Sequence, residues 1–120
     1  MSTTDYPALI ASLAPHLAAL RADIPDTTRG FGSLSQAAMR DGVLDKKAKE
    51  LIATALSVGA RCDPCIGYHV QALHKAGATR AEFAEMLGVC IQMGGGPALM
   101  YAAKAMQAWD QFGGPPPVAR

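Results

Sequence analysis

Two cysteines and a histidine lie close together near the middle of the chain: Cys62 and Cys65 are three residues apart, and His69 follows four residues later. Pro64 is typical of the first turn of a helix, because proline lacks the N–H group that would be unpaired there. We therefore expect a helix with Cys62 or Asp63 as N-cap, and with Cys65 and His69 on one face. Free N–H groups and the helix dipole favour a thiolate at this terminus, and a nearby imidazole can hold its proton. The spacing predicts a reactive thiol.

The CxxC spacing alone leaves three interpretations open. The first is a redox dithiol, because thiols three residues apart at a helix N-terminus can reach disulfide distance and exchange through the thiolate. The second is a zinc site with three ligands from this segment and Glu50 as a fourth, although a structural site usually needs a further Cys/His pair. The third is a pair of inert buried cysteines. We favour the dithiol, because the remaining candidate ligands occupy helical core or border positions: His16, His74 and Cys90.

Composition indicates a packed single domain. The chain has 120 residues, half of them hydrophobic, and a formal net charge of +1 from 11 basic and 10 acidic residues. A chain of this length can bury roughly two-thirds of its unfolded surface. The charges are scattered rather than gathered into a basic stripe, so we do not expect nucleic acid as a partner.

The distribution of cysteines and apolar residues predicts a cytoplasmic protein. Three cysteines in 120 residues do not make a disulfide scaffold. Residues 7–20 are apolar but lack a basic leading region and are interrupted by Pro15 and His16. They are too short to span a bilayer and do not resemble a signal peptide, so we expect no membrane association. In a reducing cytoplasm a CxxC pair is more often catalytic or metal-binding than structural.

Apolar spacing predicts six helices and no strand, hence an all-α domain over residues 1–112 with a flexible Pro/Gly tail at 113–120. We expect Pro15 to kink or split the first helix, over residues 5–22, and we expect a turn before a second helix at 28–40. Asp45 should cap a third helix that ends near Gly59, and Gly77 should close the CxxC helix. A capping box at residues 79–82 begins the fifth helix, and Pro97 begins a sixth with Leu99, Met106, Trp109 and Phe112 facing inward.

The third helix should be largely buried, because apolar residues cover most of its circumference. Its polar residues form one narrow strip that includes Glu50. A short loop makes this helix an antiparallel neighbour of the CxxC helix, so the strip can face the start of that helix. Glu50 also has an ordinary alternative, as an ion-pair partner of Lys46 or Lys47 on a solvated face.

With Glu50 included, the pattern is Glu50, eleven residues, Cys62, two residues, Cys65, three residues, His69. This pattern resembles the alkylhydroperoxidase D-like branch of the carboxymuconolactone decarboxylase family, as do residues 76–80 and 93–97. The resemblance covers about residues 45–112. It implies a bundle of about six helices, homo-oligomers (commonly trimers or hexamers), and a thiol-dependent peroxidase or disulfide reductase. Reduced lipoyl groups donate electrons to the best-known member.

Carried over residue by residue, the resemblance assigns a catalytic role to four side chains. Cys65 would attack a hydroperoxide, Cys62 would resolve it, and His69 with Glu50 would relay the proton. The redox-active Cys62–Cys65 disulfide would be the sole redox group, with no separate cofactor. Pro64 stands where the best-known member has a histidine. The decarboxylase branch does not rely on a CxxC motif, so decarboxylation is the weaker alternative.

Overall fold

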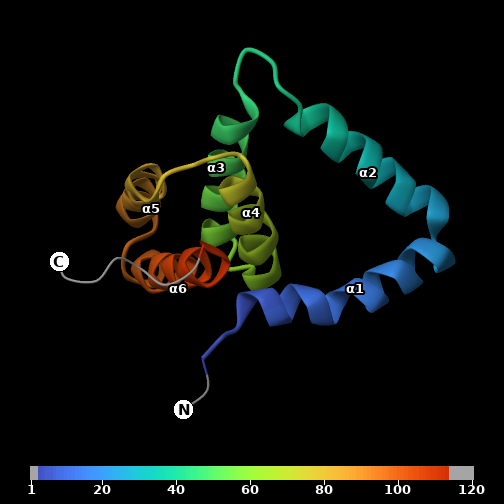
Figure 1. Ribbon diagram of the computed structural model, residues 1–120, viewed down its shortest axis with the longest axis horizontal. Coiled ribbons are helices and arrows are strands. Elements are labelled where there is room, and N and C mark those ends of the chain that lie inside the picture. Colours follow the sequence, from blue (N-terminus) through green and yellow to red (C-terminus); the bar gives the residue numbers. More distant parts are fainter. Residues whose placement is uncertain (1–2, 114–120) are drawn as a thin grey trace.

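The structure, a computed structural model, describes residues 3–113, which form six helices connected by short loops. Their order is α1 (Tyr6–Asp23), α2 (Pro25–Met39), α3 (Lys46–Gly59), α4 (Asp63–Lys75), α5 (Arg80–Gly94) and α6 (Gly96–Gly113). In Figure 1, α3 to α6 pack together as a bundle; α1 begins against this bundle, and the rest of α1 together with α2 forms an arm that reaches away from it. The predicted all-α fold is confirmed; of the tail predicted at 113–120, Gly113 ends α6 and the remaining residues lie outside the described part of the chain. Within residues 3–113, no helix is long and apolar enough to cross a membrane.

Side-chain caps fix where the helices of the bundle begin. The Asp45 side chain accepts a hydrogen bond from the Ala48 N–H at 2.8 Å, and α3 begins at the next residue. Thr79 and Glu82 form a reciprocal capping box at the start of α5, with N–H···O distances of 3.1 and 2.8 Å. These boundaries were predicted because each cap satisfies a backbone N–H that has no partner within the helix.

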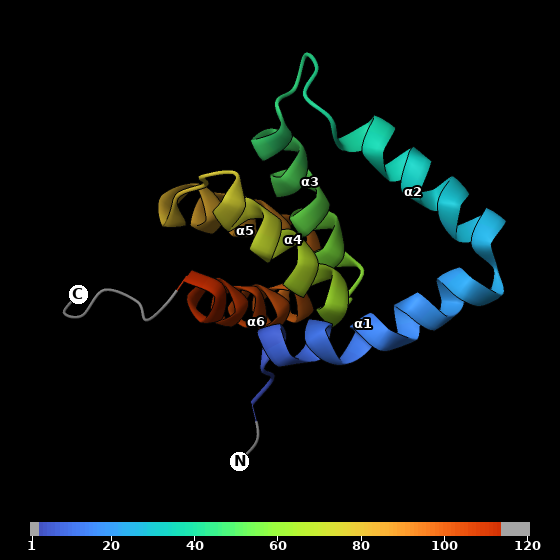
Figure 2. The same cartoon turned by 45° about the vertical axis from the view of Figure 1, so that its right-hand side comes forward.

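The arm differs from expectation at both prolines. Helix α1 continues unbroken through Pro15, so the predicted split is wrong. Pro15 has no N–H to donate to the Ala11 carbonyl, but both residues are exposed, so water can hydrogen-bond to that carbonyl instead. Helix α2 begins at Pro25 rather than Thr28, because proline suits the first position of a helix. No residue of α2 is buried, and Phe31 is 71% exposed. Figure 2 shows the arm extending from the bundle in a second view.

Helix α3 is buried along its polar strip rather than around most of its circumference. Glu50, Thr54 and Ser57 are buried together with Val58, whereas Leu56 is 69% exposed. The buried hydroxyls bond to the helix itself: Thr54 donates to the Glu50 carbonyl at 2.8 Å and Ser57 to the Ala53 carbonyl at 2.7 Å. The expectation that the polar strip faces the CxxC helix is therefore confirmed, and the expectation of a buried apolar circumference is wrong.

The core of the bundle is centred on Trp109 of α6. Its ring stacks on the ring of Phe83, with 4.7 Å between the centroids. The His74 ring lies against it at a tilt, with 3.8 Å between the centroids. His74 is therefore half-buried, and its Nε2 lies 2.9 Å from the Trp109 carbonyl oxygen. Leu99, predicted to face inward, is exposed. Small side chains form the buried face of α6 instead, which lets α4 and α5 approach closely: Ala98, Ala102, Ala105 and Ala108.

Glycine at position 67 allows α1 to lie directly against the CxxC helix. A Cβ atom there would lie 2.8 Å from Ile10 Cγ2, closer than carbon atoms normally pack. Ile10 and Gly67 are both buried, so the contact cannot relax into solvent. The absence of a side chain at Gly67 thus fixes the distance between the two helices.

We expect Gly67→Ala to lower the free energy of unfolding by about 1–3 kcal/mol, because the added methyl group must displace Ile10 or push α1 outward. The matched control is Gly88→Ala in α5, where a Cβ atom would meet nothing within 4 Å. That substitution should raise the free energy of unfolding by about 0.5–1 kcal/mol through helix propensity. Urea unfolding followed by circular dichroism measures both, and equal effects at the two positions would contradict the close approach.

Candidate redox site

Cys62 and Cys65 are joined by a disulfide at the N-terminus of α4, with 5.3 Å between their Cα atoms. Arg61 has a φ of 56° and turns the chain sharply between α3 and α4. Cys62 is then the N-cap, and its sulfur accepts the Cys65 N–H at 3.3 Å. Both cysteines are half-buried. The two sulfurs therefore lie in the field of the helix N-terminus, which stabilises a thiolate.

His69 and Glu50 form a close hydrogen-bonded pair between α4 and α3. The Nδ1 atom of His69 lies 2.7 Å from Oε1 of Glu50. Glu50 is only 5% exposed, whereas about a third of the His69 side chain is accessible. With Nδ1–H donating to the carboxylate, the Nε2 atom of the imidazole is left free to take up or release a proton. The structure thus brings all four predicted site residues together around the first two turns of α4.

Asp63, between the two cysteines in sequence, is held by groups that the sequence did not single out. The Tyr6 hydroxyl donates to Oδ1 at 2.8 Å, and the Lys104 ammonium donates to Oδ2 at 2.9 Å. Tyr6 is fully buried, and burial together with the hydrogen bond to Asp63 raises the pKa of its phenol. An acidic residue in the first turn of α4 was a visible signal, but nothing in the sequence identified its partners.

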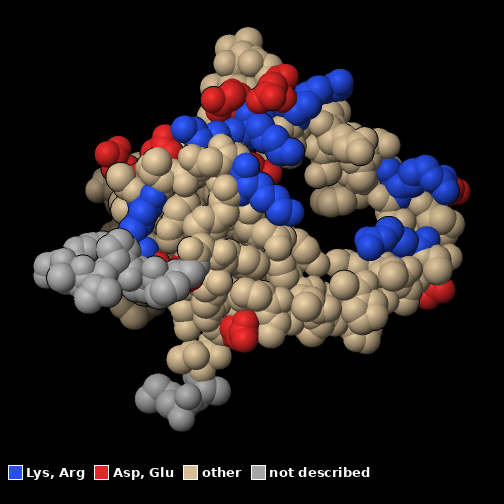
Figure 3. Space-filling model, in the orientation of Figure 1, with Lys and Arg blue, Asp and Glu red and all other residues tan. Residues whose placement is uncertain are grey.

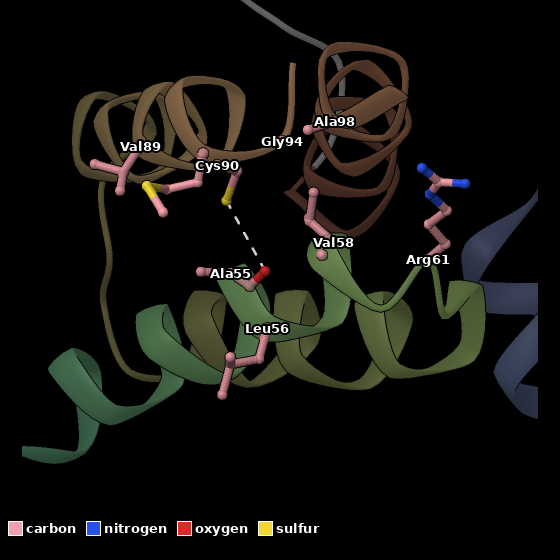
Figure 4. Close-up of a pocket in the computed structure, with 10 residues that line it drawn as sticks. Ala55, Leu56, Val58, Arg61, Val89, Cys90, Gly94 and Ala98 are labelled. Carbon is pink, nitrogen blue, oxygen red and sulfur yellow. Dashed lines mark hydrogen bonds between the residues drawn. The ribbon is translucent and has the colours of Figure 1, made fainter. Parts of the chain in front are cut away.

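A cavity of about 400 Å³ lies between α3, α5 and α6 (Figure 4). Mostly apolar side chains line it, together with Arg61 and Cys90. Cys90 points toward the Ala55 carbonyl, with its sulfur 4.0 Å from that oxygen. Neither Cys62, Cys65 nor His69 lines this cavity, so it is a separate feature from the redox pair.

The zinc interpretation finds little support in the geometry. Within residues 3–113, no group of three or more His, Cys, Asp or Glu side chains is arranged to hold a metal ion. Glu50 and His69 bond to each other, and the two sulfurs are bonded in a disulfide, so these donors already have partners.

Cys90 should be a poorly reactive thiol, because burial raises its pKa. In the oxidised protein it is the free cysteine of the three. At neutral pH we expect iodoacetamide to alkylate it roughly tenfold more slowly than in the urea-unfolded chain, because both access and the thiolate fraction are reduced. Its rate should keep rising with pH beyond about 8.5, the pKa of an unperturbed thiol. Equal rates in folded and unfolded protein, measured by mass spectrometry, would contradict this.

Comparison with known proteins places the chain in a family. A model of the carboxymuconolactone decarboxylase family matches residues 25–108. An uncharacterised protein of Cupriavidus necator is 39% identical over 108 residues, which cover 90% of this chain and 96% of that one. Uncharacterised protein 4 of the cox locus of Paracoccus denitrificans is 37% identical over 84 residues, 70% of this chain and 76% of that one.

Solved structures agree with the sequence relatives. The apo form of a carboxymuconolactone decarboxylase family protein from Legionella pneumophila has a TM-score of 0.89 and 48% identity, covering 92% of this chain and 98% of that chain. A family protein from Thermotoga maritima, for which a role in antioxidative response has been suggested, has a TM-score of 0.76 and 28% identity, covering 85% of this chain and 87% of that one. With its sequence, fold and site pattern in agreement, the chain belongs to the carboxymuconolactone decarboxylase family.

Proposed function

We propose that the protein is a thiol-dependent oxidoreductase that reduces a hydroperoxide, or a disulfide, through the Cys62–Cys65 pair. The observation that carries the proposal is a disulfide at the start of α4, one helical turn before an imidazole that a buried carboxylate orients. Family membership supports it, as does the antioxidative role suggested for the T. maritima relative. A CxxC pair at a helix N-terminus is suited to thiol chemistry, because the reactive species is the thiolate.

The first step uses Cys65 and the His69 imidazole. The Nε2 atom of His69 takes the Cys65 proton, and the thiolate attacks the terminal oxygen of the hydroperoxide. The O–O bond breaks, Cys65 becomes a sulfenic acid, and the departing alkoxide leaves as an alcohol with the proton that His69 returns. Glu50 accepts the Nδ1–H bond throughout, which keeps the ring oriented and stabilises the imidazolium.

The second step closes the disulfide and the third reopens it. The Cys62 thiolate attacks the Cys65 sulfur, the S–O bond breaks, and water leaves with the Cys62 proton. An external dithiol, such as a reduced lipoyl group on a partner protein, then reduces the pair by two successive thiol–disulfide exchanges and is itself oxidised to a disulfide. We place this cycle in the reducing cytoplasm, where such donors are available.

Substitutions should separate the roles of the four side chains. Cys65→Ser should abolish hydroperoxide turnover, whereas Cys62→Ser should stop cycling but leave a sulfenic acid on Cys65 that dimedone traps. Glu50→Gln and His69→Gln should each lower the turnover rate by about 100-fold, because both act on proton transfer.

The assay couples consumption of cumene hydroperoxide to oxidation of dihydrolipoamide, with Cys90→Ser as the matched cysteine control that should keep full activity. Sulfenic acid trapped in Cys65→Ser would reverse the roles of the two cysteines. Turnover that survives the loss of both Cys62 and Cys65 would overturn the proposed function.

We also propose that the protein acts as a homo-oligomer, in which a second copy covers the exposed apolar side chains. More than half of each of these side chains is exposed, across four helices: Phe31, Leu34, Leu56, Val89, Met93 and Met100. In Figure 3 charged side chains are scattered, wide uncharged areas lie between them, and an opening separates the arm from the bundle. Leu56, Val89 and Met93 line one pocket, and exposed apolar side chains that lie together are typical of surfaces that bind another protein.

Introducing charge on this surface should separate the copies. We expect the double substitution Leu56→Glu and Met93→Glu to convert the oligomer to monomers, because it replaces apolar interface contacts with charges. Both side chains are mostly exposed in the single chain, so the substitutions should cost its fold little. Light scattering after size-exclusion chromatography measures the mass. The control is Gln92→Glu, which adds a charge at an exposed neighbouring position without removing an apolar contact. A monomeric parent protein, or an unchanged mass in the double variant, would contradict assembly through this face.

A further inference from the structure

The charge of Asp63 is held in place beside the redox pair by two other helices. Asp63 follows Cys62 directly and precedes Cys65 by two residues. Both carboxylate oxygens are engaged, one by the Tyr6 hydroxyl from α1 at 2.8 Å and the other by the Lys104 ammonium from α6 at 2.9 Å. These two contacts fix the position of the carboxylate at the start of α4.

A carboxylate in this position opposes the chemistry of the site unless its charge is neutralised. A nearby negative charge disfavours a thiolate, and the helix N-terminus favours it. Lys104 supplies the compensating positive charge, and about a third of its side chain is exposed. Tyr6 cannot do so, because it is neutral and burial raises the pKa of its phenol.

Lys104 is itself held toward Asp63 by its surroundings. Its ammonium lies 5.0 Å from the centre of the Tyr101 ring, one turn earlier on α6, in the geometry of a cation–π contact. The other ionisable groups near the start of α4 are Arg61, on the preceding loop, and the His69–Glu50 pair.

We propose that Lys104 is a positioning residue that sets the reactivity of the Cys62–Cys65 pair by neutralising Asp63. The inference rests on the proposed function only in that the pair cycles between dithiol and disulfide. When Lys104 is present, the thiolate form of the reduced pair is favoured and the disulfide is reduced more readily. When it is absent, the uncompensated carboxylate shifts the pair toward the protonated dithiol and the disulfide.

Opposite substitutions distinguish this charge effect from loosening of the fold. Lys104→Met should lower the acid dissociation constant of the more acidic thiol by about three- to tenfold, because it leaves Asp63 unpaired. Asp63→Asn should raise the same constant by a similar factor, because only the cation remains. The double variant should return close to the parent value, and Lys104→Arg should retain it. A structural disturbance would not reverse sign between the two partners of one ion pair.

The experiment titrates the ultraviolet absorbance of the thiolate against pH in reduced full-length protein carrying Cys90→Ser. The thiol–disulfide equilibrium with dithiothreitol, measured at a pH above the thiol pKa, gives the reduction potential of each variant. We expect these potentials to follow the same order as the acid dissociation constants. A tenfold change in the equilibrium constant corresponds to about 30 mV. Lys75→Met, which removes a lysine at the far end of α4, should change neither quantity.

Shifts of Lys104→Met and Asp63→Asn in the same direction, or shifts below twofold in both, would overturn the proposal. Circular dichroism identifies any variant that fails to fold. If Lys104→Met does not fold, the direction of the shift in the acid dissociation constant is still decided by Asp63→Asn, with Lys104→Arg as the unshifted reference. These measurements need no turnover, so their outcome is independent of the peroxidase assay. Opposite shifts in a protein that consumes no hydroperoxide would leave this inference intact while the proposed function failed.

Discussion

The hydrogen bond between Glu50 and His69 is the interaction on which the rest of the site depends. A carboxylate that is 5% exposed is costly to bury unless it is paired, and the imidazole is its partner here at 2.7 Å. Because the two residues come from α3 and α4, the bond also fixes how these helices face each other. Cys65, in the first turn of α4, is thereby placed one helical turn from an oriented imidazole.

Burying a polar strip between α3 and α4 has a consequence for the outer surface. Leu56 of α3 is left mostly exposed, and it lines one pocket together with the exposed Val89 and Met93 of α5. The arm adds more apolar surface, since α2 buries none of its residues. The arrangement that builds the site thus leaves a surface suited to contact with another copy, and the proposed assembly and chemistry follow from the same packing.

Local sequence signals predicted the helix boundaries well, whereas contacts between residues far apart in the sequence could not be predicted. The caps Asp45, Cys62 and Thr79 could be read from the sequence, because each acts within a few residues of itself. The short loop between α3 and α4 made it predictable that the polar strip of α3 faces the CxxC helix, whereas the pairing of Glu50 with His69 was implied by the family resemblance. The partners of Asp63 were not predictable, since they are 57 and 41 residues away and only the packing of α1 and α6 brings them there.

The central claim is that Cys62 and Cys65 are one redox unit. A single-turnover experiment mixes the fully reduced protein with one equivalent of hydroperoxide, then unfolds the chain in urea, alkylates its free thiols and identifies the products by mass spectrometry. We expect the loss of two hydrogens per chain, a Cys62–Cys65 crosslink in the digest, and Cys90 alkylated as a free thiol. Oxygen added to Cys90, or a disulfide between chains in place of the internal one, would contradict it.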